Sequence, residues 1–162
     1  MKKALLLAAG LFCSASTLAA ASQPFPPPSD TQPVRNLAQE NRNLQLVYHF
    51  YDQFFNDHNL SAADRDLSAG YKQHNPHVPD GRAPFVKYFA GYFKANPQAH
   101  SVISQYGTYG DRVFLRVHSV RNPDDRGRAI VDIFRVKDGK IVEHWDSVQD
   151  VPATAANDNT MF

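Results

Sequence analysis

The chain has 162 residues, of which 17 are basic, 16 are acidic and 43% are hydrophobic. This length fits one domain with a hydrophobic core of its own. The near-neutral balance excludes the strongly basic surface that general nucleic-acid binding needs, so we expect no nucleic acid as a partner.

The first 21 residues have the pattern of a secretory signal peptide. Lys2 and Lys3 precede a short apolar run, and small residues then lead to Ala21, after which we expect cleavage. The run is shorter than the roughly 20 residues of a membrane-spanning helix, so we expect no stable membrane anchor. Cleavage would remove Cys13, the only cysteine, and leave an exported chain, periplasmic or secreted, without a thiol.

A proline-rich linker is predicted over residues 22–35, and a single domain over residues 36–162. Apolar side chains recur every three or four positions from 36 to 56, which predicts an amphipathic helix. A short second helix is predicted over 60–68, with Ser61 as its N-cap.

Residues 71–81 contain two prolines and a glycine, so this segment is predicted to be irregular. A third helix is predicted to begin near Pro84 and to carry an aromatic stripe through Phe93. These rings belong mainly to the predicted core, and some of them could line a cavity for a planar or apolar ligand.

After Pro97 the apolar pattern changes to a period of two, which is typical of strands. Four strands are predicted, over residues 100–109, 112–121, 128–136 and 140–150. The short turns between them predict an antiparallel meander. Helices followed by strands indicate an α+β fold, with the helices packed on one side of the sheet.

Polar side chains interrupt two of these strands. The loop between the second and third strands centres on Asp125, so a hairpin symmetric about that residue places His118 directly opposite Asp132. A shift of one residue would instead put them on opposite faces of the sheet. The pair suits proton abstraction and return, and a buried structural pair is an equally good interpretation.

The Asp138–Gly139 turn allows two registers for the last hairpin. A two-residue loop places Asp132 opposite Trp145. A three-residue loop places it opposite His144, with Asp146 on the same side and Trp145 on the other face. The residues alone leave both registers open, and we interpret Trp145 as a packing residue.

The loop His74-Asn75-Pro76-His77 carries a third polar cluster. It could close a pocket mouth and hold a ligand carbonyl or hydroxyl, or serve only as a turn. A metal site from these histidines, His118, His144 and the aspartates would need three ligands converging at about 2 Å. The spacing supports such a site weakly, so we predict none.

Three stretches carry a family resemblance: YKQHNPHVPDG (71–81), VDIFRVKDGKIVEHWDSVQDVP (131–152) and the terminal Asn159–Phe162. Together they resemble the SnoaL-like polyketide cyclase group of the nuclear transport factor two-like superfamily. The resemblance implies helices packed on a curved antiparallel sheet that forms a cone with a central pocket. It also implies ring closure by intramolecular aldol condensation without a metal or cofactor.

Site residues follow from the resemblance. It gives the acid/base role to Asp132 and a place beside it to His118, so these two form the predicted catalytic set. It favours the three-residue loop, and it implies a homodimer through the outer face of the sheet, near Trp145. The predicted ligand pocket contains His74, Asn75, Phe114, Phe134, His144 and Asp146.

Two functions are consistent with these features. The first is a cofactor-free enzyme that performs aldol, isomerase or dehydratase chemistry on a small carbonyl compound. The second is a non-catalytic envelope protein that holds a small apolar ligand in the same pocket. The signal peptide disfavours a nascent polyketide as the substrate, because polyketide cyclases work in the cytoplasm beside their synthases.

Overall fold

The computed structural model describes residues 35–162. The predicted signal peptide and nearly all of the predicted linker lie outside these residues. The elements in chain order are α1 (Leu37–Tyr51), the π-helix η1 (Asp52–Asn56), α2 (Ser61–Asp66), β1 (Leu67–Gln73), α3 (Arg82–Ala95), β2 (His100–Tyr109), β3 (Arg112–Val120), β4 (Arg128–Lys137) and β5 (Lys140–Asp150).

The helices and four of the strands lie close to the predicted segments. Asn36 caps α1, because its side chain accepts a hydrogen bond from the Gln39 N–H at 3.0 Å. The predicted first helix continues through one π-turn, η1, before it ends. In α2, Ser61 is the first helical residue rather than the N-cap, and its hydroxyl donates to Asn59 instead.

Five strands form one sheet, in the order β1-β5-β4-β3-β2. The strands β2 to β5 make the predicted antiparallel meander. The sequence interpretation missed β1, which occupies the end of the predicted second helix and the start of the predicted irregular segment. This strand runs parallel to β5, so the sheet is mixed and open rather than wholly antiparallel.

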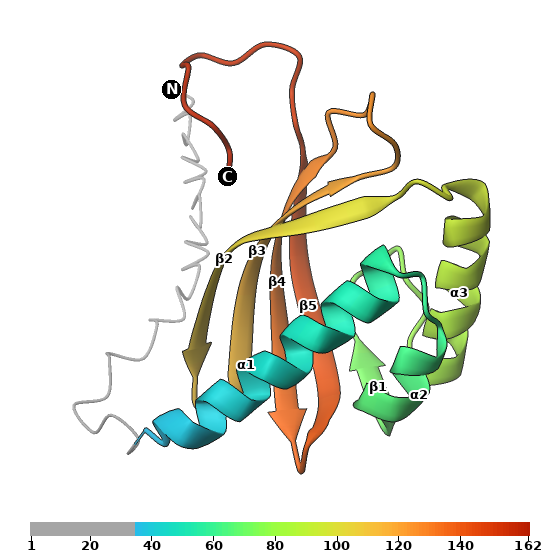
Figure 1. The fold of residues 1–162 in the computed structure, drawn as a ribbon, viewed down its shortest axis with the longest axis vertical. Helices are drawn as coiled ribbons and strands as arrows, with labels where there is room; N and C mark the ends of the chain where they lie inside the picture. Colours follow the sequence, from blue (N-terminus) through green and yellow to red (C-terminus); the bar gives the residue numbers. More distant parts are fainter. Residues whose placement is uncertain (1–34) are drawn as a thin grey trace, which may run out of the picture. The chain divides into compact units, whose positions relative to one another are not determined.

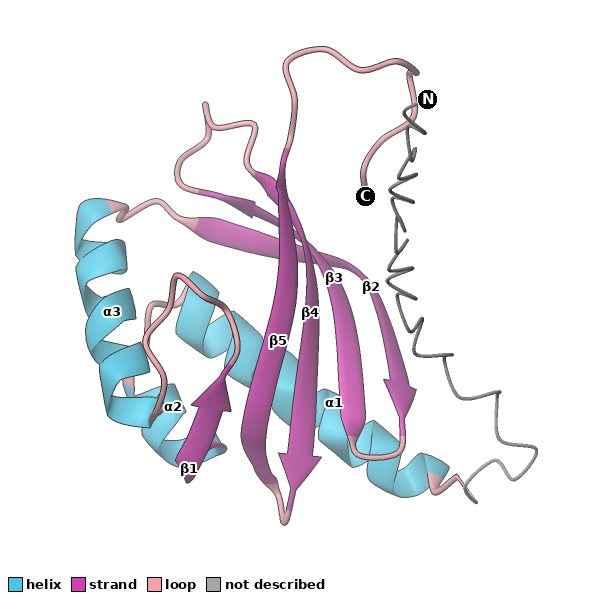
Figure 2. Ribbon diagram, turned by 180° about the vertical axis from the view of Figure 1, so that it is seen from behind, coloured by secondary structure: helices cyan, strands magenta, loops and turns pink. Residues whose placement is uncertain are grey.

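The α1 helix lies diagonally across one face of the sheet, as Figure 1 shows. We call this the inner face, and the opposite one the outer face. Seen from behind, no described helix covers the outer face of β2 to β5 (Figure 2). The core fills the space between α1, α3 and the inner face, where Val47, Phe54, Phe85, Val113 and Leu115 are all buried. The α+β class with helices on one side is therefore confirmed.

Within residues 35–162, no helix is long and apolar enough to cross a membrane.

Candidate active site

A cavity of about 380 Å³ lies against the inner face of the sheet. Its helical wall is aromatic: Tyr51, Phe55, Phe85, Tyr88, Phe89, Tyr92 and Phe93 contribute to it. Its sheet wall is polar and includes Ser101, Arg128, Asp132, His144 and Asp146. An apolar pocket with a few convergent polar groups is the usual form of a small-molecule site. The predicted central pocket is present.

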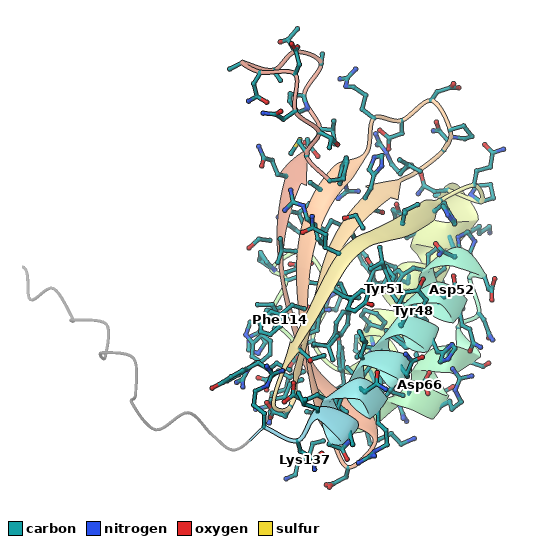
Figure 3. The ribbon with its side chains drawn as sticks, turned by 60° about the vertical axis from the view of Figure 1, so that its left-hand side comes forward. Tyr48, Tyr51, Asp52, Asp66, Phe114 and Lys137 are labelled. Carbon is teal, nitrogen blue, oxygen red and sulfur yellow. The ribbon has the colours of Figure 1, made fainter. Side chains whose placement is uncertain are left out.

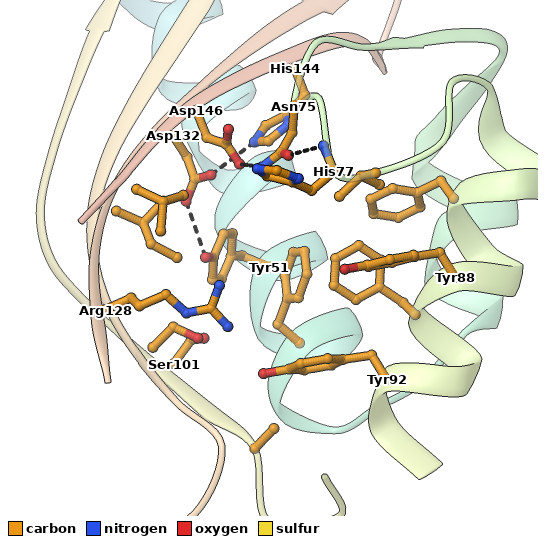
Figure 4. A pocket seen from close by; sticks show the side chains of 18 of the residues that line it. Tyr51, Asn75, His77, Tyr88, Tyr92, Ser101, Arg128, Asp132, His144 and Asp146 are labelled. Atoms are coloured by element: carbon orange, nitrogen blue, oxygen red, sulfur yellow. Dashed lines mark hydrogen bonds and ion pairs between the residues drawn. The ribbon is translucent and has the colours of Figure 1, made fainter. Parts of the chain in front are cut away.

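Asp132 is the centre of the polar wall. Its side chain projects from the inner face of β4 and is 4% exposed. The Tyr51 hydroxyl donates to Oδ2 at 3.1 Å, and His144 Nε2 lies 2.8 Å from Oδ1 (Figure 4). Burial and the nearby Asp132 charge raise the pKa of Tyr51 well above 10, so its hydroxyl stays protonated and can serve as the donor.

The ring of His144 is held between Asp132 and Gln73. The Gln73 Oε1 atom accepts from the Asn75 N–H at 3.0 Å and lies 2.9 Å from His144 Nδ1. Since that oxygen can only accept, Nδ1 must carry a proton. The short Nε2–Oδ1 contact then requires a second proton, carried either by His144 Nε2 or by Asp132.

Asp146 completes this end of the cavity. It is the register partner of Asp132 on the neighbouring strand, and its Oδ2 accepts from Asn75 Nδ2 at 2.6 Å. Asn75 thus ties the loop after β1 to the polar wall, which agrees with its predicted place in the pocket. Cross-strand partners on one face have Cβ atoms about 5 Å apart, so the two carboxyl groups share one neighbourhood.

Among residues 35–162, Asp132, His144 and Asp146 form the group whose side chains are best placed to hold a metal ion. One ligand atom from each of Asp132, His144 and Asp146 lies within 4.8 Å of the other two. A cation there would have to break the hydrogen bond between His144 Nε2 and Asp132 Oδ1, because Nε2 faces the carboxylate and Nδ1 faces Gln73.

His118 does not lie opposite Asp132, so the predicted pairing is wrong. The β3–β4 register pairs Leu115 with Asp132 and His118 with Ala129. This differs from the predicted hairpin by an odd number of residues, which turns His118 to the outer face. There its ring stacks on Phe162 at a centroid distance of 4.2 Å, and Nε2 donates to the Arg126 carbonyl.

The last hairpin combines features of both predicted registers. Its turn has two residues, and positive φ angles at Asp138 (51°) and Gly139 (70°) identify a type I′ turn. A bulge then follows, because Val136 pairs with Ile141 but Arg135 pairs with Glu143. The bulge turns His144 and Asp146 inward, as the three-residue loop would have done, and Trp145 outward.

Two further predicted pocket residues lie on the outer face. Phe114 pairs with Ile133 and projects away from α1, whereas Tyr51 lies between α1 and the sheet (Figure 3). His74 follows the inward Gln73, so strand alternation turns it outward. It stacks on Trp145 at a centroid distance of 4.8 Å and contacts Glu143 Oε1 at 2.8 Å.

Phe134 is on the inner face but supports the site from behind. It is 2% exposed and packs against the His144 ring at a centroid distance of 4.7 Å. It is not among the side chains that line the cavity.

Sequence reasoning missed two residues of this network, Tyr51 and Gln73. Tyr51 lies within the predicted amphipathic helix over 36–56 and fits its apolar face, but a buried tyrosine hydroxyl needs a hydrogen-bond partner, which a phenylalanine does not. Gln73 belongs to the strand that was not predicted, where it lies beside His144 in the parallel ladder. The only signal in the sequence was the spacing of Tyr71 and Gln73 on either side of Lys72, and both residues are buried in β1.

The fold and the site define a small α+β protein with a buried aspartate–histidine pair at the wall of an aromatic pocket. A family model for the SnoaL-like domain matches residues 47–144, so the chain belongs to the SnoaL-like domain family. No curated protein sequence matches the chain significantly.

Solved structures share the fold. A proposed polyketide cyclase from Bacillus cereus ATCC 10987 superposes with a TM-score of 0.61 at 21% identity, over 70% of this chain and 78% of that one. A proposed ketosteroid isomerase from Kribbella flavida DSM 17836 gives 0.60 at 15% identity, over 74% and 86%. A proposed SnoaL-like polyketide cyclase from Jannaschia sp. CCS1 gives 0.58 at 17%, over 75% and 91%.

Proposed function

We propose that this protein is an enzyme that moves protons next to the carbonyl group of a small, largely apolar molecule. The observation that carries the proposal is the Asp132 carboxyl group, buried at the wall of an aromatic cavity and bonded to Tyr51 and His144. The names of the structural neighbours, cyclase and isomerase, belong to the same class of chemistry.

In the proposed reaction, Asp132 takes a proton from the carbon next to the substrate carbonyl. The electron pair of the broken C–H bond forms the enolate, with its charge on the carbonyl oxygen. Return of the proton to another carbon gives an isomer. Attack of the enolate carbon on a second carbonyl forms a C–C bond, and Asp132 then protonates the new alkoxide.

His144 and Tyr51 hold the carboxyl group in place for this transfer. Each carboxylate oxygen has a second lone pair, so both contacts leave room for a substrate proton. The 2.8 Å contact between His144 Nε2 and Asp132 Oδ1 fixes the orientation of the carboxyl group at the cavity wall.

Export and self-association extend the proposal. The signal-like segment before residue 22 supports release from the cytoplasm. On the outer face of the sheet, Val131 and Val102 are 39% and 53% exposed, which supports a homodimer through this face.

The test is the exchange of α-protons for deuterium in D2O, followed by NMR over a panel of aryl and alkyl ketones. The chain should accelerate exchange, and Asp132→Asn should lower the rate at least about 100-fold while keeping the fold. Asp124→Asn, at an exposed position in the β3–β4 loop, is the matched control and should have no effect.

Equal exchange by Asp132→Asn and the wild type would refute the proposed role of Asp132. Tight binding of a co-purified ligand by both proteins, with no turnover of any panel member, would favour the binding-protein alternative. Mass spectrometry of the ligand before and after incubation distinguishes the two functions.

A further inference from the structure

A second charged residue lies in the same cavity as Asp132. Arg128 is the first residue of β4, four positions before Asp132 on the same inner face, so their Cα atoms lie about 13 Å apart along the strand. Its side chain extends into the cavity near Tyr51 and Ser101 (Figure 4). The cavity therefore has a carboxyl group toward one end and a guanidinium toward the other.

Arg128 differs from the other arginines of the described chain. The side chain of every other arginine among residues 35–162 donates at least one hydrogen bond. Within the same range, the Arg128 side chain forms no hydrogen bond or ion pair, although the Arg128 backbone pairs with Ser119 and Asp150 in the sheet. Two arginines precede Arg128 closely in the sequence, and both have partners. Arg121 binds Asp125 at 2.9 Å, and Arg126 donates to the Val151 carbonyl at 3.3 Å.

The Asp150 carboxylate lies near Arg128 but does not form an ion pair with it. Asp150 is the register partner of Arg128 on β5 and lines the same cavity, yet the two side chains form no ion pair among the described contacts. Arg128 is directed toward the aromatic wall instead. Burial raises the pKa of Tyr92, and the positive charges of Arg128 and Arg121 partly oppose that rise.

An unpaired guanidinium facing a partly apolar cavity is suited to an anionic ligand group. The planar fork of arginine matches a carboxylate with two parallel hydrogen bonds. The hydroxyl groups of Ser101 and Ser119 line the same cavity and could complete the binding of such a group. Asp132, Asp146 and Asp150 also line the cavity, and their charges disfavour a doubly charged anion.

We propose that Arg128 binds a carboxylate of the substrate, so that the ligand is an aromatic or otherwise apolar monocarboxylic acid. The aromatic wall contacts its apolar body, and the reacting carbonyl reaches Asp132. The placement of the carbonyl rests on the proposed function, whereas carboxylate binding by Arg128 does not.

The test compares acids with their neutral amides in calorimetric titrations of the whole chain. The probes are 3-phenylpropanoate, 4-phenylbutanoate and 4-oxo-4-phenylbutanoate, each with its primary amide. At least one acid should bind about tenfold or more tightly than its amide, as expected for a charge-assisted hydrogen bond. If no acid binds more tightly than its amide, the proposal is wrong.

Substitutions test whether Arg128 is the residue that causes the preference for the acid. Arg128→Gln should remove the preference for the acid and leave amide affinity unchanged, while Arg128→Lys should keep part of it. Arg126→Gln is the matched control, two residues away, and should keep the full preference. An unchanged preference in a folded Arg128→Gln would overturn the proposal.

Two more variants separate this inference from the proposed function. Asp132→Asn should lose proton exchange on 4-oxo-4-phenylbutanoate but keep the preference for the acid. If the wild type lacks exchange yet shows a preference that depends on Arg128, the proposed function fails and the inference stands. If Asp150→Asn creates a preference that the wild type lacks, Asp150 is the natural partner of Arg128 and the inference fails.

Discussion

The Tyr51 hydroxyl is the simplest part of the site to test, because one substitution removes it and keeps the ring. Tyr51→Phe deletes the hydrogen bond to Asp132 Oδ2, which is 3.1 Å long and buried. A hydrogen bond to a charged group contributes about 1.5–3 kcal/mol, and water in the cavity can replace part of it, so we expect a loss of about 1–2 kcal/mol. For a domain of this size, that corresponds to a fall in Tm of roughly 3–8 °C.

The pH dependence of this loss is a sharper test than its size. Tyr51 has a folded-state pKa well above the ordinary value of 10.0. A raised pKa contributes stability that is fully present below pH 10 and is lost as the pH rises, because the unfolded chain ionises first. The wild type should lose about 1.4 kcal/mol per pH unit from this residue above pH 10, whereas Tyr51→Phe should not.

The assay is urea unfolding followed by circular dichroism at pH 7, 9 and 11. The stability gap between the wild type and Tyr51→Phe should be constant from pH 7 to 9 and should nearly close at pH 11. The control is Tyr48→Phe on the same helix, where the side chain is 44% exposed and forms no hydrogen bond among the described contacts (Figure 3). A gap that persists at pH 11, or an equal loss in Tyr48→Phe, would refute the reasoning.

Two further predictions concern Glu40 and the two histidines. The hydrogen bond from Arg35 is the main cause that lowers the pKa of Glu40 to about 2, so its contribution to stability is present above pH 4.5 and lost as the pH falls toward 2. The free energies of unfolding of the wild type and Glu40→Gln should therefore converge as the pH falls over this range. A constant difference between them down to pH 2 would contradict this prediction. His144→Ala should lower α-proton exchange at least about tenfold and His118→Ala less than twofold, and equal losses would show that the pocket histidine has no special role.

Much of the fold could be predicted because its helices and meander have strong periodic patterns. The β1 strand could not, since it is short and carries only a weak alternation around Tyr71 and Gln73. Its pairing is parallel and links it to β5, the last strand, and such long-range pairing leaves little trace in the local sequence. The missed strand also hid the partner that orients His144.

The site was predicted in part, and the errors come from register. Asp132, His144, Asp146 and Asn75 meet in the cavity as expected. His118 does not, because an odd shift in the β3–β4 pairing reverses its face, and no rule of turn symmetry fixes the register of a long loop. Arg128 was overlooked because nothing in the sequence marks an arginine that lacks a partner.

The bulge in β5 has a consequence for comparing this chain with its relatives. Val142 is the extra residue, and its removal would leave Phe134 paired with His144 and Arg135 with Glu143. A homologue that lacks this position could keep the same inward histidine one residue nearer to the turn. An alignment that places the gap after His144 would then match His144 to a residue of the outer face. Matching β5 residues by their pairing with β4 avoids that error, since the pairing from Arg128 to Arg135 is regular.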